Sequence, residues 1–367
     1  MKQALSALEL RMLTKELDSL IGAKISQIYD QGKDDLLLQL HHTGVGKEIV
    51  RIRPPFALYK GSEKPMMEGG RSGFCSLLRQ KVSNSNILAQ SQHGFDRIWV
   101  ASLGHLVPEA YLIVEFFGKG NIILTDDKLM VIGAVEERSF GIRSTKKQAL
   151  YQFPTQPINP FNLDDKAFFD VLSSSNKNQL VKAFALDMSL GGLYAEELCL
   201  RAGVEKSSSP SDITLESIKK IIASLKSFEV VKPQVVFKDF APHDCVAADL
   251  VVYEGLEKKY FDSFSDAQAF FWSAYMPPKK LNPRRQKLET IIADQKRHFD
   301  ALSTESVESQ KKGELIYLHY PIVKEVLRVV KESGKTIGWK EAKRRLNNHP
   351  LVKDIDEKKG EVELELQ

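Results

Sequence analysis

Asp96 and Arg97 are the residues of this chain whose types and positions best suit contact with another molecule. They stand side by side in "GFDRIWVAS", directly before an apolar run that is typical of a strand. A guanidinium can hold a phosphate or stack on an unpaired base, and a carboxylate beside it can orient it or accept from a base edge. The structural alternative is an aspartate that caps a turn, followed by an arginine on the strand face. The pair by itself leaves both interpretations open.

Gly191 and Gly192 are candidates for a phosphate contact. They interrupt two short amphipathic segments in "DMSLGGLYAEELCLRAGV", and Gly203 ends the second segment. A tight turn of this kind aims the first amide groups of the second helix at whatever lies in front of it, and helix N-termini attract phosphate. A plain corner between two helices fits the same pattern.

Positive charge is concentrated in one segment of the chain. Residues 279–300 carry seven Lys or Arg against three Asp or Glu, an excess that equals the formal charge of +4 of all 367 residues. A basic segment on an otherwise balanced chain predicts local docking of a polyanion, because neutralised phosphates release counterions. A solvated helix face is the alternative.

Motifs of enzymatic and metal chemistry are absent from the sequence. There is no C-x-x-C, H-E-x-x-H or phosphate-binding G-x-x-x-x-G-K-[ST] loop. His41 and His42 are adjacent, so on a strand they point to opposite faces. Gly118 and Gly120 in "FGKGNIILTD" lie between two strands and predict a hairpin turn. No cofactor and no metal are predicted.

Length and composition predict a soluble protein of two or three domains. The chain has 367 residues, 43% of them hydrophobic and 27% charged. Its three cysteines, an odd number and far apart, argue against a disulfide framework and favour a reducing compartment. No secretory or membrane-spanning segment is recognisable, which predicts a cytoplasmic protein without membrane contact.

The hydrophobic periodicity predicts an α+β fold. Ser6 and Glu9 have the spacing of a capping box at the start of a helix that Gly22 ends, and antiparallel strands and a helix at 71–84 follow. Prolines at 154, 157 and 160 precede a helical stretch at 164–229, after which β structure returns. A new helix is expected to start at Asn282-Pro283, followed by another helical unit at 313–348. The first of these helices carries a coiled-coil seam at Leu288, Ile292, Gln295, Phe299 and Leu302.

Five segments of the chain occur in the order found in a known family. They are "SALEL", "FDRI", "GKGNIILTD", "GGLYAEELCLRAG", and "KKGELIY" followed by "TIGWKEAKRRL". Each is weakly specific alone, but in this order they resemble the NFACT family over essentially the whole chain. That family includes bacterial RqcH, the nuclear export mediator factor and proteins labelled fibronectin-binding A-like.

The resemblance implies three domains. The first, 1–160 plus about 231–278, is expected to be similar in fold to formamidopyrimidine-DNA glycosylases, with antiparallel sheets. A helix-hairpin-helix domain would cover 161–230, and 279–367 would begin a coiled coil and middle domain. The sequence stops inside the strand-like "GEVELELQ", which predicts a truncated chain whose missing part supplies the second arm of the coiled coil. The resemblance implies that the family's C-terminal RNA-binding module lies beyond Gln367.

The resemblance also implies a function in ribosome-associated quality control. Such a protein binds a large ribosomal subunit that carries peptidyl-tRNA and recruits an aminoacyl-tRNA, expected to be alanyl-tRNA, so that the stalled nascent chain grows a tail without a template. The ribosome would form the peptide bonds, so the protein is expected to act by positioning and not as an enzyme. Two alternatives are a nucleic-acid repair protein of the same fold and a fibronectin-binding surface adhesin. Glycosylases attack with an N-terminal proline, whereas this chain begins Met1-Lys2-Gln3, which argues against repair.

For the site, the resemblance implies that Asp96 and Arg97 engage tRNA. Glu9 stands where the family usually has aspartate, and it also belongs to the capping box. The family commonly has arginine where Lys119 stands, so this position keeps the charge but loses bidentate phosphate recognition. The further expected RNA contacts are Asn121, Gly191, Gly192, Lys279, Lys280, Arg284, Arg285, Lys343, Arg344 and Arg345.

Overall fold

The computed structural model describes residues 4–32, 34–44, 46–61, 72–141, 143–274, 283–336, 339–346, 351–356, 359 and 361–366. The chain divides into two compact units, Met1–Met276 and Pro277–Gln367. This border lies close to residue 279, where the sequence predicts a new domain, and the finer division of the first unit stays a prediction.

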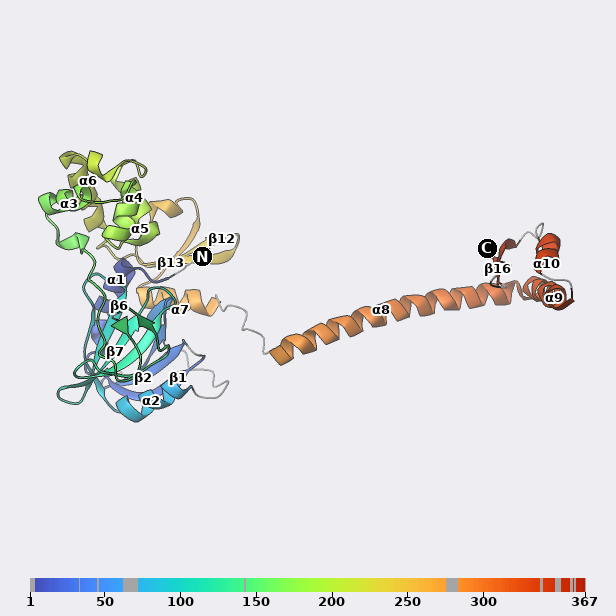
Figure 1. Cartoon of the computed structure of the whole chain (residues 1–367), viewed down its shortest axis with the longest axis horizontal. Coiled ribbons are helices and arrows are strands. Elements are labelled where there is room, and N and C mark those ends of the chain that lie inside the picture. The colour runs from blue at the N-terminus through green and yellow to red at the C-terminus, as the bar shows by residue number, and fades with distance from the viewer. Residues whose placement is uncertain are drawn as a thin grey trace. The chain divides into compact units, whose positions relative to one another are not determined.

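A nine-stranded antiparallel sheet dominates the first unit (Figure 1). Its order is β4-β3-β2-β1-β5-β6-β7-β8-β9, so the chain runs outward from the middle strand, returns through α2 (Gly73–Val82), and runs outward again. The strands are β1 (Lys24–Asp30), β2 (Leu36–His42), β3 (Gly46–Arg53), β4 (Ala57–Gly61), β5 (Asn86–Gln92), β6 (Ile98–Gly104), β7 (Pro108–Glu115), β8 (Asn121–Asp126) and β9 (Val131–Ala134). The predicted α+β class with antiparallel hairpins is confirmed.

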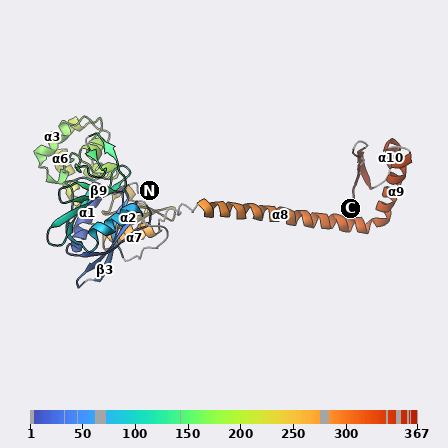
Figure 2. The ribbon, with the colours of Figure 1, turned by 60° about the horizontal axis from the view of Figure 1, so that its bottom comes forward.

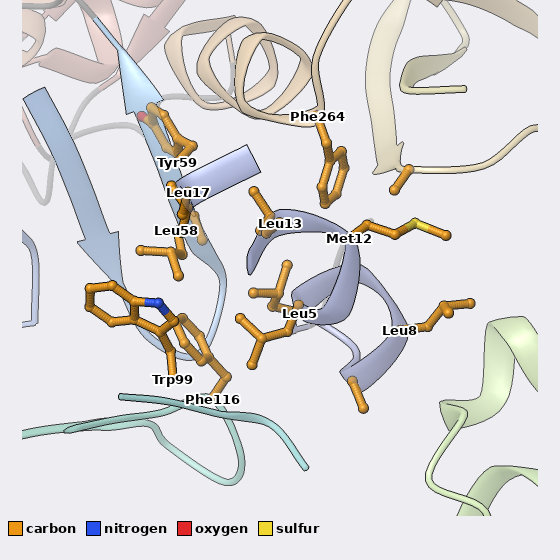
Figure 3. Close-up of a cluster of buried hydrophobic side chains, with 14 of the residues drawn as sticks. Leu5, Leu8, Met12, Leu13, Leu17, Leu58, Tyr59, Trp99, Phe116 and Phe264 are labelled. Atoms are coloured by element: carbon orange, nitrogen blue, oxygen red, sulfur yellow. The ribbon is translucent and has the colours of Figure 1, made fainter. Parts of the chain in front are cut away.

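Helix α1 (Ala7–Leu17) connects this sheet to the rest of the unit. The predicted capping box is present: the Ser6 hydroxyl accepts from the Glu9 amide at 3.2 Å, and the Glu9 carboxylate accepts from the Ser6 amide at 2.9 Å. Its apolar stripe is buried, and Figure 3 shows Leu13 and Leu17 near Leu58, Trp99 and Phe264. Burial of this stripe from both sides fixes the helix in place.

Along the chain, the helical stretch predicted at 164–229 comes between the strands of the large sheet and those of a second one. It consists of α3 (Asp165–Ser173), α4 (Leu180–Lys182), the π-helical turn η3 (Ala183–Asp187), α5 (Gly191–Ala202) and α6 (Leu215–Ser227). Gly203 ends α5 in the left-handed conformation at φ +64°, as the sequence predicts. Short 3₁₀ turns occur at η1 (Asp18–Leu20), η2 (Pro160–Asn162), η4 (Pro210–Asp212) and η5 (Val251–Tyr253).

The predicted return to β structure is confirmed, but these strands form a sheet of their own. Strands β12 (Gln234–Lys238), β13 (Ala241–Val246) and β14 (Glu257–Tyr260) pair in the order β13-β12-β14, and β10 (Ser139–Phe140) and β11 (Arg143–Ser144) form a separate two-stranded ribbon. Helix α7 (Phe264–Ala274) then packs on β4, where the Gln268 side chain bonds both the amide and the carbonyl of Leu58. The Glu16 carboxylate accepts from the Phe264 amide at 2.7 Å and so ties α1 to the start of α7.

The second unit contains α8 (Pro283–Leu318), α9 (Tyr320–Thr336), α10 (Trp339–Leu346), β15 (Val352–Asp356) and β16 (Glu361–Leu364). The sequence predicts a new helical unit from residue 313, but α8 continues unbroken through Gly313, as Figure 2 shows. A single glycine inside a helix costs only about 1 kcal/mol, which the surrounding helix-forming residues tolerate. Along the predicted seam, Ile292, Phe299 and Leu302 are 61–70% exposed, and the Leu288 side chain lies outside the described residues.

Candidate functional site

Asp96 and Arg97 lie in the tight turn between β5 and β6. The His93 amide donates to the Ile98 carbonyl at 3.0 Å and the Asp96 amide to the His93 carbonyl at 3.2 Å, which closes the turn. Oδ1 of Asp96 accepts from the Arg97 amide at 2.7 Å. Asp96 therefore caps its own turn, as the structural alternative predicts, while both side chains stay half-buried and face a cleft.

The Arg97 guanidinium is half-buried, and no hydrogen bond to a described residue holds it in place. Across the described residues it has no hydrogen-bond or ion-pair partner. Burial lowers the pKa of Arg97 from its ordinary value, and the nearby Asp96 carboxylate acts in the opposite direction. A desolvated cation in this state gains free energy from an incoming anion, because the anion replaces the lost water.

Glu9 is buried at the floor of the same cleft, with 1% of its surface exposed. Besides closing the capping box, its Oε1 accepts from the Tyr194 hydroxyl of α5 at 3.2 Å. Burial raises the pKa of Tyr194 well above its usual value, and the Glu9 and Asp244 carboxylates raise it further. The phenol therefore stays protonated and donates.

Asp244 and Tyr253 complete this floor, and the sequence analysis missed both. Oδ2 of Asp244 accepts from the Tyr253 hydroxyl at 2.6 Å, and Oδ1 accepts from the Cys245 amide at 2.7 Å. A β-bulge precedes Asp244, because Val236 pairs with Asp244 and Phe237 with Pro242, which leaves His243 extra. The only sequence signal was a carboxylate inside the otherwise apolar strand run "DCVA".

Gly191 and Gly192 form the start of α5 on the opposite wall. Gly191 has φ +76°, a conformation that favours glycine, and the N-cap residue Leu190 provides no side-chain acceptor for the first amides of the helix. Both glycines line the cleft. The positive end of the helix therefore borders the same space as Arg97.

These segments enclose a cleft of about 500 Å³. It brings together residues 4–9, the Asp96-Arg97 turn, residues 185–194, Asp244 and Tyr253, which are up to 249 positions apart in the chain. Figure 1 shows α1 between the large sheet and the helical insertion, with β13 beside it. The rim offers a cation and helix amides, and the floor offers carboxylate acceptors.

A further positioning contact links two of these segments. Nε2 of Gln92, at the end of β5, donates to the carbonyl of Ala7 at 2.9 Å and to the carbonyl of Asp96 at 2.8 Å. The start of α1 and the turn that carries Arg97 are thereby held by one amide group.

Other predicted site residues lie elsewhere. Lys119 is exposed in the β7–β8 turn and lines a separate cleft of about 550 Å³ with Arg53. Asn121 is 2% exposed, and its side chain bonds the backbone of Ile122 and Glu136, so it holds the sheet together and offers no surface to RNA.

The predicted basic contacts belong to the second unit or lie beyond what is described. Lys279 and Lys280 lie outside the described residues. Arg284 and Arg285 fall in α8, with side chains outside the described set. Helix α10 carries Lys343, Arg344 and Arg345, of which Lys343 donates to the Ile355 carbonyl at 3.2 Å.

Three general properties bear on the chemistry. Within the described ranges, no group of three or more His, Cys, Asp or Glu could hold a metal ion. Cys75, Cys199 and Cys245 are all buried, and none of the three is in a disulfide. No helix in the described part of the chain has both the length and the apolar character needed to cross a bilayer.

Comparison with known proteins supports a common ancestry over most of the chain. An archaeal Rqc2 homolog, aRqcH of Methanocaldococcus jannaschii, is 29% identical over all of this chain and 59% of its own length. The human ribosome quality control complex subunit NEMF is 23% identical over 93% of this chain and 35% of its own length. The chain therefore spans about three fifths of the length of the archaeal relative and about one third of the length of the human relative.

Solved structures share the fold of the first unit. A fibrinogen binding protein from Staphylococcus aureus covers 74% of this chain and 100% of its own at a TM-score of 0.59 and 18% identity. The MutM (Fpg) protein of Thermus thermophilus matches 61% of this chain at a TM-score of only 0.34 and 11% identity.

The model of the NFACT N-terminal and middle domains matches residues 6–332. This match includes every segment that lines the cleft except residues 4 and 5. The chain belongs to the NFACT family.

Proposed function

We propose that this chain belongs to a cytoplasmic ribosome-associated quality-control factor. It would bind the large ribosomal subunit with peptidyl-tRNA and recruit an aminoacyl-tRNA, so that the stalled nascent chain is extended at its C-terminus without a template. The names of the archaeal and human relatives support the quality-control part of this proposal. Alanyl-tRNA is the proposed tRNA, on the family resemblance.

The observation that carries the proposal is the Arg97 guanidinium in the cleft. It is half-buried and has no partner among the described residues, and the uncapped start of α5 borders the same space. Both features favour a phosphate. The half-buried Asp96 adds an acceptor for the N–H groups of a base edge, while the buried Glu9 and Asp244 carboxylates lie on the floor beneath it. A nucleotide of an unpaired RNA segment matches this arrangement, because its phosphate suits the cation and the helix amides and its base edge suits a carboxylate acceptor.

The proposed role is positioning, and peptide bond formation stays with the ribosome. A protein that holds a tRNA in place converts an encounter between two molecules into an effectively intramolecular step, which accounts for a large rate effect without a nucleophile. Lys119, Gly191, Gly192, Lys279, Lys280, Arg284, Arg285, Lys343, Arg344 and Arg345 remain proposed RNA contacts, whereas buried Asn121 is left out.

The test is tRNA binding by this 367-residue chain and by two arginine variants. Arg97→Ala removes the unpartnered cation of the cleft, and Arg138→Ala removes an arginine that is 23% exposed and pairs with Glu136 outside the cleft. We expect Arg97→Ala to weaken tRNA binding by about 2 kcal/mol, or about thirtyfold, and Arg138→Ala to change it little. Thermal stability of Arg97→Ala should stay close to that of the unmodified chain.

Raising the salt concentration should weaken tRNA binding steeply in the unmodified chain and in Arg138→Ala. Equal weakening by the two substitutions would mean that only overall charge matters, and the cleft would lose its proposed role. A large loss of stability in Arg97→Ala would favour the structural interpretation of the Asp96-Arg97 pair.

A further inference from the structure

The tip of the β12–β13 hairpin carries an aromatic residue, Phe240, whose ring is not packed against the rest of the described chain. Lys238 pairs with Ala241, so the connection consists of two residues, Asp239 and Phe240. Their φ values are +52° and +62°, and the Phe240 side chain is 100% exposed. Phe240 is thus the most exposed phenylalanine among the described residues, and its backbone is in the left-handed conformation.

The two residues at this tip are not the types that stabilise such a turn best. A two-residue hairpin loop with both φ values positive is a type I′ turn, for which Asn-Gly is the preferred pair. A phenylalanine at the second position is strained, because its Cβ approaches the following carbonyl in the left-handed region. Packing does not compensate for this strain, because the ring is fully exposed. A strained residue that contributes no packing points to a role in contacting something else.

The hairpin leads directly to the cleft. Strand β13 runs from Ala241 to Val246 and carries Asp244, whose carboxylate lies on the cleft floor. Asp244 lies four positions after Phe240, which corresponds to about 13 Å along a strand. One strand of a stacked nucleic acid covers that distance in about four nucleotides.

We infer that Phe240 stacks on an unpaired base of the same RNA whose nucleotide occupies the cleft. This inference rests on the proposed function. An aromatic ring stacks on any base, because every base has a π face. Lys238, next to the tip, is an exposed cation that can meet an RNA phosphate. The carboxylates of Asp239 and Glu257 are exposed beside it, so the ring and not net charge carries the contact. The hairpin would then hold the RNA strand at the point where it leaves the cleft.

The turn itself provides the sharpest test. The double variant Asp239→Asn, Phe240→Gly installs the preferred type I′ pair and removes the ring. We expect this variant to melt at a higher temperature than the unmodified chain, because the strain is relieved. Its affinity for single-stranded RNA should nevertheless fall by about tenfold. Phe240→Trp keeps a ring that stacks and should keep the affinity.

The probe is a set of single-stranded RNA oligonucleotides with 2-aminopurine at successive positions, titrated against each variant and against Arg97→Ala. Stacking on Phe240 should change the fluorescence of the base at one position, and the double variant should lose that change. RNA binding that depends on Arg97 but is equal in the double variant would overturn this inference and leave the proposed function standing. RNA binding that is absent, or indifferent to Arg97, would overturn both.

Discussion

The side-chain amide of Gln92 donates to the carbonyl oxygen of Asp96 at 2.8 Å, and the same nitrogen donates to the carbonyl of Ala7 at 2.9 Å. The position of the Asp96-Arg97 turn relative to the first turn of α1 therefore depends on one side chain. Because Glu9 lies in that first turn, Gln92 sets how the Glu9 and Asp96 carboxylates lie relative to each other.

Gln92→Glu should uncouple these two segments. A carboxylate cannot donate, and it would face two carbonyl oxygens instead. We expect a loss of about 2 kcal/mol in the free energy of unfolding and weaker tRNA binding. The measurements are urea unfolding and tRNA titration, with Gln152→Glu as a control that adds the same charge at an exposed position. Unchanged tRNA binding by Gln92→Glu would show that the cleft tolerates movement of the turn.

Glu9 has a structural and a proposed functional role, and two substitutions separate them. Glutamine also fits a capping box, and its amide can donate to the Tyr194 oxygen, so Glu9→Gln should stay within about 1 kcal/mol of the unmodified stability. Glu9→Ala removes the box and the acceptor of the buried Tyr194 hydroxyl proton, at a cost of about 2–4 kcal/mol. If the negative charge of Glu9 contributes to tRNA binding, Glu9→Gln should lower the affinity for tRNA while the stability stays nearly unchanged. Equal affinity would assign Glu9 to the helix start alone.

Gly191 and Gly192 provide a matched pair at the start of α5. Neither glycine has an atom within 4 Å of an added Cβ, but only Gly191 has a positive φ. Gly191→Ala should therefore destabilise the protein by about 1 kcal/mol, whereas Gly192→Ala should be neutral or slightly stabilising. Thermal unfolding of the two variants checks this. Equal destabilisation would mean that crowding and not backbone conformation limits this wall of the cleft.

His93 should make stability depend on pH. Burial lowers the pKa of His93 below its usual 6.5, although Asp96 acts in the opposite direction. In the unfolded chain the pKa returns to about 6.5, so below that pH the unfolded state binds more protons. The contribution is fully present above about pH 6.5 and is lost as the pH falls through the lowered pKa. Denaturant unfolding at pH 7.5 and 5.5 should show a smaller acid loss for His93→Gln than for the unmodified chain.

An equal acid loss in both proteins would contradict the lowered pKa of His93. The carboxylates that also titrate are common to both, so their contribution cancels in the comparison. The Gln156 amide, 3.1 Å from Nε2 of His93, remains available to the substituted glutamine.

The features predicted correctly were those that depend on neighbouring residues. The capping box of Ser6 and Glu9, the hairpin at Gly118 and Gly120, and the end of α5 at Gly203 all lie where the sequence predicts them. Asn121 shows the limit of this approach. It was expected as an RNA contact on the family resemblance, but its amide is used inside the sheet, because the backbone of Glu136 lies within its reach.

The sequence by itself determined the local elements, the α+β class and the pair of residues from which the site was inferred. Only the tertiary structure decided that Arg97 has no partner among the described residues, and that Asp244 and Tyr253 join Glu9 on one floor. The physical reason is range: caps, turns and periodicity act within a few residues, whereas a cleft arises where helices and strands far apart in the chain pack together. The bulge at His243 and the positive φ of Phe240 follow from how β12 pairs with β13, and no spacing in the sequence predicts them.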